Sequence, residues 1–436
     1  MTNYVILGTG VAGIGAAEAI RSQDKTGNIT FIGDDSHGYY SRPGLAYYLT
    51  GEVDENLLYP YQPQDYKNLN AHYLRGSATR ILPQEHQVEL GDSTRIPYDR
   101  LLIAIGSGAI RLTVPGIKLE GVVKLDHMED AQRILGFSKR ARSAVVVGGG
   151  ITALELAEGL AARKVKVSLL IRTQRYWSNV LDEVESIIID ERLKELGIQV
   201  YYLTELSEVL GKRGRVAGIR TVDGREMACD MLAYGIGVQP RLRIAQKAGI
   251  ACERGILVDE HLRTNIADIF AAGDVAQVFD PASGRSVLDS LWAPARDQGS
   301  VAGMNMAGKN LAYLKPVPFN VTRLAGLTLT IIGQVGSGLD GDPVDIARGD
   351  SETWRDMPDA IIAQSGFQVN HLRLMVADKT IVGAIVMGDQ KLSSALQIII
   401  RDRIDIVSIR EQLLAPDAPI ADIVAHFWGQ VHASRN

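Results

Sequence analysis

Two glycine-rich turns carry the residues whose type and spacing could bind a nucleotide. In the first, GTGVAG at residues 8–13, the glycines directly follow a short apolar run and open a small-residue segment with helical spacing. Gly8 permits the tight turn, Gly10 lets the backbone approach a pyrophosphate, and Gly13 lets helix and strand pack closely. The first helical residues, Val11 and Ala12, offer unpaired N–H groups to the phosphates. In this context the turn predicts a dinucleotide site rather than a plain bend.

A carboxylate is expected at the end of the next strand, where it would bind a ribose hydroxyl. The strand NITFIG ends in Gly33, and Asp34 and Asp35 follow it. Because Gly33 occupies the most usual position of the acid, either aspartate can serve. We take Asp34 as the candidate.

The same pattern returns in SAVVVGGG, residues 143–150, followed by the helical segment ITALELAEGLAARK and the strand VKVSLLIR. Gly148 and Gly150 form the turn, and Ile151 and Thr152 open the helix. Ala153 replaces the third glycine, which spaces helix and strand slightly but leaves the pyrophosphate turn intact. Two copies of this unit predict two dinucleotides.

Two arginines follow the second strand of this repeated unit, at the place where an NADH enzyme usually has a carboxylate. Arg172 and Arg175 could bind a 2′-phosphate, which favours NADPH. Equally, they could be solvated side chains beside the adenosine, with NADH still accepted. The sequence leaves NADH and NADPH open.

Thiol and metal chemistry have little support in the sequence. Cys229 and Cys252 are separated by twenty-two residues, which fits neither a redox CxxC pair nor a zinc knuckle. The eight histidines show no metal-ligand spacing. We therefore expect two reduced thiols and assign no metal.

Composition bounds the class of protein. The chain has 436 residues, with 46% hydrophobic and 22% charged residues and a net charge of −5, which predicts a globular protein of several domains without a nucleic-acid footprint. The sequence contains no uninterrupted run of about 18 apolar residues, so we expect no membrane span. Its sparse cysteine suits the cytoplasm.

The pattern along the chain predicts an α/β fold with two Rossmann-like dinucleotide-binding domains and a C-terminal α+β domain. Gly/Pro-rich crossings at residues 106–116 and 235–241 separate the domains. We expect an FAD-type domain at 1–113 and 242–316, a second nucleotide domain at 114–241 and a C-terminal domain at 317–436. In the last, LRLMVADKTIVGAIVMGD predicts a hairpin and KLSSALQIIIRDR a helix.

Further motifs resemble the FAD/NAD(P)H oxidoreductases of the pyridine nucleotide-disulfide reductase superfamily, whose fold is like that of glutathione reductase. TNIADIFAAGDVA contains Gly273 and Asp274, and LLIAIGSG contains Ala104 and Gly106. The resemblance implies that FAD occupies the first fingerprint, with Asp274 near its ribityl chain or pyrophosphate, and that NADH or NADPH occupies the second. It also places residues of GIGVQPR and LWAPARDQGSVAGMNMAG, among them Gly237 and Ala293, at the cofactors.

Within the superfamily, the segment YSRPGLAYYL is most similar to rubredoxin and ferredoxin reductases and to the flavoprotein part of NADH-dependent nitrite reductases. The resemblance places Arg42, with Pro43, against the FAD phosphates; alternatively, Arg42 is a surface residue before a helix. Many members carry a lysine where this chain has Tyr47, and that lysine pairs with a glutamate equivalent to Glu155. Tyr47 could pack on the flavin or nicotinamide, or serve only to pack its helix.

Residues 39–51 contain no cysteine, so the thiol chemistry of other superfamily members is disfavoured. The resemblance then implies hydride entry from NAD(P)H to flavin and electron exit to an external acceptor. A helix expected to begin near Asp297 could stabilise charge on the flavin. The expected partner is rubredoxin, ferredoxin or a partner subunit, and the C-terminal domain suggests a homodimer. Alternatives are an oxidase or quinone reductase, and a non-catalytic flavoprotein resembling apoptosis-inducing factor.

Overall fold

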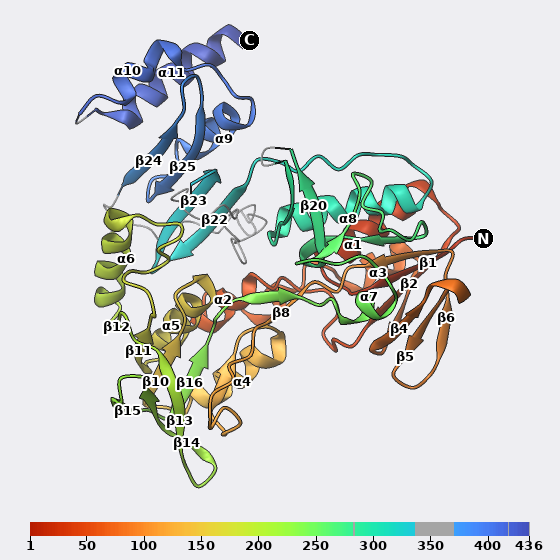
Figure 1. Cartoon of the computed structure of the whole chain (residues 1–436), viewed down its shortest axis with the longest axis horizontal. Helices are drawn as coiled ribbons and strands as arrows, with labels where there is room; N and C mark the ends of the chain where they lie inside the picture. The colour runs from red at the N-terminus through yellow and green to blue at the C-terminus, as the bar shows by residue number, and fades with distance from the viewer. Residues whose placement is uncertain (282–283, 336–369, 417, 436) are drawn as a thin grey trace. The chain divides into compact units, whose positions relative to one another are not determined.

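The computed structural model describes residues 1–281, 284–335, 370–416 and 418–435. The chain forms two compact units, whose elements are labelled in Figure 1. The first unit contains residues 1–167 and 206–315. The second contains residues 168–205, 316–335 and the described residues from 370 onward. Residues 336–369 of the predicted C-terminal domain lie outside the described residues.

A five-stranded parallel sheet in the order β19-β7-β1-β2-β3 forms the centre of the first unit. Its inner strands are mainly apolar because both faces of a parallel sheet are covered, and Val5, Ile6 and Leu7 are at most 1% exposed. The last strand in sequence comes from beyond residue 242, so the chain leaves this sheet and returns to it. The strands are β1 (Asn3–Leu7), β2 (Asn28–Gly33), β3 (Ala71–Arg75), β7 (Arg100–Ile103) and β19 (Ile269–Ala271).

Two helices, α1 (Val11–Gln23) and α8 (Trp292–Met306), pack on each other unusually closely. A Cβ at Gly299 would lie 2.1 Å from the Ala12 carbonyl oxygen, and one at Gly303 would lie 2.3 Å from that of Ala16. Glycine at these positions lets the helix of the returning segment lie against the helix of the first fingerprint.

Smaller elements complete this part of the unit. They are α2 (Gly44–Thr50), η1 (Glu55–Leu58), α3 (Pro63–Leu69), β4 (Ala78–Leu82), η2 (Pro83–Glu85), β5 (Gln87–Leu90), β6 (Arg95–Pro97), α7 (Arg243–Lys247), β18 (Ile256–Leu257), η3 (Gly273–Val275), β20 (Ala276–Asp280) and β21 (Arg285–Leu288).

The second glycine turn also connects a strand to a helix within the first unit. β10 (Ser143–Val147) pairs in parallel with β16 (Met231–Tyr234), which pairs in parallel with β9 (Val122–Lys124). The helices are α4 (Met128–Ser138) and α5 (Ile151–Ala162), and β13 (Leu206–Lys212), β14 (Arg215–Thr221) and β15 (Glu226–Ala228) form an antiparallel sheet. Both copies of the repeated unit therefore begin with the strand, turn and helix that the sequence predicts.

The two predicted crossings pair with each other. β8 (Ser107–Ala109) and β17 (Val238–Pro240) are antiparallel, with Val238 opposite Ala109 and Pro240 opposite Ser107. Sequence patterns identified both segments as Gly/Pro-rich connections but gave no sign that they hydrogen-bond to each other.

The second unit contains a four-stranded antiparallel sheet in the order β22-β23-β25-β24, and three described helices follow its last strand in sequence (Figure 1). The predicted hairpin is confirmed, with its turn closed by a bond from Ala377 N–H to Thr380 O, and the predicted helix is confirmed as α9. The elements are β22 (Phe319–Leu324), β23 (Leu327–Gly333), β24 (His371–Val376), β25 (Ile381–Met387), α9 (Ser393–Arg401), α10 (Val407–Leu413) and α11 (Ile420–Arg435).

Residues 168–205 belong to the same unit. β11 (Lys166–Leu170) runs into it and pairs in parallel with β12 (Gln199–Tyr201), and α6 (Glu183–Glu195) lies between them in sequence. Across both units, no described helix combines the length and apolarity needed to cross a membrane. The predicted α/β class, with its C-terminal α+β part, agrees with these elements.

Candidate functional site

The first fingerprint forms a tight turn that only glycine can make at two of its positions. Gly8 has φ +104°, and a Cβ there would lie 2.3 Å from the carbonyl oxygen of Ala104. A Cβ at Gly13 would lie 2.3 Å from Gly8 O, whereas one at Gly10 would meet no atom within 4 Å. Gly8 and Gly13 are thus required by packing, while Gly10 borders open space. This arrangement fits a pyrophosphate beside Gly10.

The helix that follows the turn supplies the donors for such a group. Gly10 is the N-cap of the 13-residue α1 and, as a glycine, has no side chain that could cap the helix. The first N–H groups of a helix have no partner inside the helix and carry the positive end of its dipole. Val11 and Ala12 therefore stand where the fingerprint predicts phosphate-binding amides.

The two candidate ribose-binding acids follow β2 but differ in their contacts. Asp35 accepts a hydrogen bond from the His37 amide at 2.8 Å, which closes a local turn. Asp34 is exposed and accepts a bond from Ser77 Oγ at 2.9 Å. Since Asp35 is used by its own turn, Asp34 remains the candidate for the ribose hydroxyl.

The predicted second FAD motif lies against the first. Gly273 has φ +77°, and a Cβ there would approach Ala12 Cβ to 3.1 Å. The Gly273 N–H donates to Oε1 of the fully buried Gln298 at 2.8 Å, and Asp274 Oδ2 accepts from Ser107 Oγ at 2.7 Å. The motif is thereby fixed beside the first turn of α1.

The segment containing Ala104 and Gly106 completes this set. Ala104 N–H donates to Leu7 O at 2.8 Å, directly before the first fingerprint. Gly106 has φ +62°, and a Cβ there would meet nothing within 4 Å. Three segments distant in sequence thus meet at one edge of the parallel sheet, with two glycines, Gly10 and Gly106, bordering open space.

The helix expected to begin near Asp297 begins earlier. α8 starts at Trp292 after an extended N-cap at Leu291, so that Asp297 lies in its second turn. Pro294 does not oppose this start, because proline is tolerated in the first helical turn, where its missing N–H has no helical partner to lose. Ala293 lies in that first turn. The helix thus begins five residues before the position predicted from the sequence.

Arg42 lies in a cluster of charged side chains that the sequence did not reveal. Its Nη2 lies 3.2 Å from His127 Nδ1 and its Nη1 lies 3.9 Å from Asp126 Oδ1. Arg241 Nη2 lies 3.4 Å from Asp126 Oδ2, and Lys124 Nζ lies 3.7 Å from the same oxygen. We call these five side chains the Asp126 cluster. Pro43, next to Arg42, is the N-cap of α2.

The ring of His127 contacts three members of the cluster. Its Nε2 lies 3.3 Å from both Asp126 Oδ2 and Arg241 Nη2, and its Nδ1 lies 3.2 Å from Arg42 Nη2. Burial lowers the pKa of His127 below its usual 6.5, and the neighbouring Arg42 lowers it further, against the opposing effect of Asp126. His127 is therefore neutral at neutral pH.

The second fingerprint has the same construction with one substitution. Gly148 has φ +142°, and a Cβ there would lie 2.1 Å from Gly235 O and 2.8 Å from Ala153 Cβ. Gly150 caps α5 and a Cβ on it would meet nothing within 4 Å. The methyl of Ala153 is accommodated because Gly235 faces the start of α5 without a side chain. Ile151 and Thr152 form that start.

Gly237 lies two residues further along the same segment. Its φ is +109°, and its carbonyl accepts a bond from Ile110 N–H at 3.0 Å, joining the two crossings. Its expected place at the cofactors stays a prediction.

The helices that carry the two candidate catalytic residues pack on each other. Tyr47 lies on α2 and Glu155 on α5, and both side chains are partly exposed. A Cβ at Gly159 would lie 2.8 Å from Leu49 Cβ, and Arg163 Nε donates to Leu49 O at 2.9 Å. The fold thus places the segment without cysteine against the helix of the second fingerprint. The roles of Tyr47 and Glu155 stay predictions.

The two arginines predicted at a 2′-phosphate, Arg172 and Arg175, differ in their surroundings in the second unit. Arg175 is half-buried, and its Nε and Nη2 lie 3.4 Å from the carbonyls of Leu181 and Ser178. The Arg172 side chain is exposed. Arg175 is therefore engaged with its own loop, and Arg172 is the better candidate of the two.

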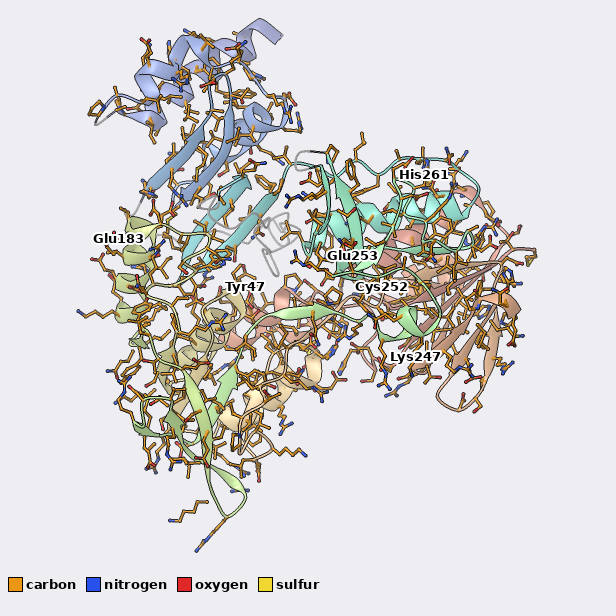
Figure 2. All side chains as sticks on the ribbon, viewed as in Figure 1. Tyr47, Glu183, Lys247, Cys252, Glu253 and His261 are labelled. Carbon is orange, nitrogen blue, oxygen red and sulfur yellow. The ribbon has the colours of Figure 1, made fainter. Side chains whose placement is uncertain are left out.

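Neither thiol is suited to redox chemistry. Cys229 is buried, and burial raises its pKa to about 11. Burial also raises the pKa of Cys252, which lies next to Glu253 and well apart from Tyr47 (Figure 2). Because the thiolate is the reactive form, the raised pKa values favour the less reactive, protonated form of both cysteines at neutral pH.

One group of described side chains in the second unit has atoms spaced as metal ligands: Asp182, Glu185 and His371 lie within 4.8 Å of one another. Both Glu185 oxygens are held by Arg373, with Nε at 2.8 Å and Nη2 at 2.9 Å. A guanidinium in this position repels a metal ion, so we assign the group a structural role. We call it the Glu185 cluster.

Comparison with known proteins agrees with these features. The family described as pyridine nucleotide-disulphide oxidoreductase matches residues 2–299. The chain is similar to the ferredoxin–NAD(+) reductase component of a biphenyl dioxygenase system from Paraburkholderia xenovorans, with 30% identity over 353 residues covering 80% of this chain and 84% of that protein. The crystal structure of NADH:rubredoxin oxidoreductase from Clostridium acetobutylicum superposes with a TM-score of 0.72 at 25% identity, covering 98% of this chain and 99% of that one.

A third similarity covers only part of the relative. The nitrite reductase [NAD(P)H] of Bacillus subtilis is 26% identical over 405 residues, which are 92% of this chain and 47% of that protein. The chain thus spans about half the length of that relative.

Proposed function

Because the chain belongs to the pyridine nucleotide-disulphide oxidoreductase family, we propose that it takes electrons from NADH or NADPH and passes them through FAD to an external carrier protein. FAD supplies the redox chemistry: it accepts a hydride and can release the electrons one at a time. The chain itself binds, orients and shields the two nucleotides.

The fit of FAD rests on the three segments that meet at the sheet edge in the first unit. Gly10 and Gly106 leave space that a Cβ would fill, and the N-terminus of α1 supplies donors for the pyrophosphate. Asp274 would contact the ribityl chain or pyrophosphate, Asp34 the adenosine ribose, and Arg42 the phosphates. Ala293, in the first turn of α8, would lie near the positive end of that helix's dipole.

The observation that carries the proposal is the lack of a cysteine in α2 and the residues around it. In thiol-dependent members of the superfamily, a cysteine in this segment takes electrons from the flavin. Residues 39–51 contain none, and both thiols of the chain are held protonated elsewhere. Electrons therefore have to leave to an acceptor outside the chain.

Similarity to proteins named for ferredoxin and rubredoxin supports a small redox protein as that acceptor. Such partners dock through small, charged and transient interfaces, since fast turnover requires rapid release. A partner subunit is the corresponding proposal if the chain works within a larger assembly. A homodimer and a cytoplasmic location remain predictions, of which the first is tested by light scattering.

The proposal is tested by supplying purified holoprotein with NADH or NADPH and either rubredoxin or a [2Fe–2S] ferredoxin, with cytochrome c as the terminal acceptor. We expect cytochrome c reduction to depend on the carrier and to be unchanged in the Cys229→Ser/Cys252→Ser double variant. Fast oxygen or quinone reduction without a carrier effect would instead support an oxidase or quinone reductase. Failure of both nucleotides to reduce the flavin would favour the non-catalytic alternative.

A further inference from the structure

A continuous set of contacts joins Asp274 to Arg42, two residues that are far apart in sequence and that we both place near the FAD pyrophosphate. Ser107 Oγ donates to Asp274 Oδ2 at 2.7 Å. Arg241 Nη1 donates to the carbonyl oxygens of Ser107 and Ile105, the latter at 2.9 Å. Asp126 then connects Arg241 to Arg42. The cluster therefore ties both interdomain crossings to the proposed phosphate site.

Asp126 is the centre of this set. It is 3% exposed, and its Oδ2 also accepts a bond from Ala109 N–H at 3.2 Å, in the first crossing. A buried carboxylate is costly unless cations and donors surround it. The chain meets that cost with cations from three distant segments: Arg42 before α2, Lys124 at the end of β9, and Arg241 after β17.

The charged side chains in this region carry a net positive charge that an anion could balance. Arg42, Lys124 and Arg241 contribute three positive charges against the carboxylates of Asp126 and Asp130, the latter bound to Lys124 Nζ at 2.6 Å. With His127 neutral, the contacting groups carry one net positive charge. Arg42 lies 3.9 Å from Asp126 and is 35% exposed, so its guanidinium still has donors directed elsewhere.

We propose that Asp126 is a positioning residue for FAD binding. It holds the guanidiniums of Arg42 and Arg241 so that Arg42 meets the FAD pyrophosphate and Arg241 fixes the crossing that carries Ser107 and thereby Asp274. The inference rests on the proposed function, because it takes FAD to be the ligand of Arg42.

The sign of the effect separates positioning from simple electrostatics. Asp126 is an anion near a proposed diphosphate site, so by Coulomb's law its neutralisation alone would strengthen FAD binding. If Asp126 acts by holding the arginines, its neutralisation weakens FAD binding despite the lost repulsion. The two accounts predict opposite changes in the dissociation constant.

The test measures FAD binding to apoprotein by fluorescence quenching for Asp126→Asn, Arg42→Met and the double variant. Asn keeps the size of the side chain and can still accept from Ala109 N–H. We expect Asp126→Asn and Arg42→Met each to weaken binding by about tenfold, the loss of one charge-assisted contact. In the Arg42→Met background the Asp126 substitution should add little, because its main target is gone.

Two further variants guard against a merely structural effect. Glu129→Gln removes a carboxylate from the first turn of α4, three residues after Asp126, and should leave FAD affinity unchanged. Asp126→Glu keeps the charge and should recover part of the lost affinity. Thermal unfolding of each apoprotein shows whether the fold is intact.

The outcomes distinguish the two proposals. Unchanged FAD affinity in Arg42→Met overturns the assignment of Arg42 to the FAD phosphates, and with it the basis of this inference. Weakened binding in Arg42→Met but unchanged or tighter binding in Asp126→Asn overturns the positioning role alone. Weakened binding in both, with additive losses in the double variant, also contradicts positioning through Arg42.

Discussion

The Asp126 and Glu185 clusters each hold a buried carboxylate with arginine and histidine, but they satisfy it differently. Glu185 is 0% exposed, and a single guanidinium, that of Arg373, holds both its oxygens at 2.8 and 2.9 Å. Asp126 is shared by Arg42, Arg241 and Lys124 at 3.4 to 3.9 Å. One carboxylate is saturated at short distance by one cation, and the other is loosely surrounded by several.

The difference separates a structural ion pair from a ligand site. The Glu185 cluster is closed: Arg373 Nη2 also donates to Val180 O at 2.8 Å, and Asp182 caps α6. The Asp126 cluster keeps excess positive charge and a partly exposed arginine, which costs free energy unless an anion binds. In this chain the partly exposed, loosely held arginines thus belong to the proposed ligand site, whereas the bidentate Arg373 has a structural role.

The largest expected effect is on stability, at Glu185. Glu185→Gln removes the two short contacts of the Arg373 guanidinium with a buried carboxylate and leaves it only the longer contact with Asp182, at 3.5 Å. Breaking a buried pair in this way costs up to about 3–5 kcal/mol. Chemical denaturation should show that loss with FAD affinity unchanged. Glu183→Gln, on the same helix and labelled in Figure 2, is the matched control and should change stability by less than about 1 kcal/mol. Equal stability of the two variants would contradict the comparison.

The opposite balance is expected at Gly10, where FAD affinity should change more than the stability of the apoprotein. Gly10→Ala adds a methyl group that meets no protein atom within 4 Å but would enter the space proposed for the pyrophosphate. FAD affinity should fall by about tenfold to a hundredfold, the cost of overpacking. Apoprotein stability should fall by only about 1 kcal/mol or less, because alanine is a poorer N-cap than glycine. Gly136→Ala in α4, whose Cβ would also meet nothing, should retain full affinity. Normal affinity in Gly10→Ala would remove FAD from this turn.

The two clusters should also titrate in separate pH windows. The pKa of His127 is lowered in the folded state, mainly by burial and Arg42, so the unfolded chain takes up its proton first as pH falls below about 6.5. Stability should then decline below pH 6.5 until the folded pKa is reached. The surrounding charges are Arg42, Asp126, Lys124 and Arg241.

Glu185 acts at lower pH. Burial alone would raise its pKa, but His371 and Arg373 outweigh that and lower it below 4.5. Its contribution to stability is complete above pH 4.5 and is lost as pH falls through the folded pKa. Apoprotein unfolding against pH should lose the upper decline in His127→Gln and the lower one in Glu185→Gln. An unchanged upper decline in His127→Gln would show that another group controls it.

The smallest effect is expected at Arg172, an arginine of the second unit that is exposed rather than buried. Arg172→Leu should lower the preference for NADPH over NADH by about fivefold, because an exposed ion pair contributes about 1 kcal/mol. Steady-state kcat/KM with each nucleotide measures it. Arg175→Leu should instead lower stability, since Arg175 holds its own loop. A larger shift in nucleotide preference at Arg175 than at Arg172 would reverse this assignment.

Local patterns predicted most of the elements. Both glycine turns, the helices after them and the C-terminal hairpin are visible in sequence because each depends on neighbouring residues. The function of Gly13 could also be stated in advance, since its close contacts, with Gly8 and Ile6, lie within one strand–turn–helix unit. The close contact of Gly8 is with Ala104, which the local pattern does not show.

Long-range contacts could not be predicted in this way. The Asp126 cluster joins residues 42, 124–127 and 241, and no periodicity links those positions. The pairing of β8 with β17, which brings Arg241 to Ser107, also joins segments far apart in sequence and could not be predicted for the same reason. The sequence offered Arg175 both as a phosphate ligand and as a solvated side chain, because its partners, backbone carbonyls of its own loop, cannot be read from the sequence.

The central claim is that electrons enter from a nicotinamide nucleotide and leave without a thiol. Its most direct test is anaerobic titration of the holoprotein with NADH and with NADPH, following the long-wavelength flavin band, in the wild type and in Cys229→Ser/Cys252→Ser. We predict full bleaching by at least one nucleotide at one equivalent per flavin, identical in the two proteins. Absence of bleaching with both nucleotides, or a requirement for either cysteine, would contradict the account.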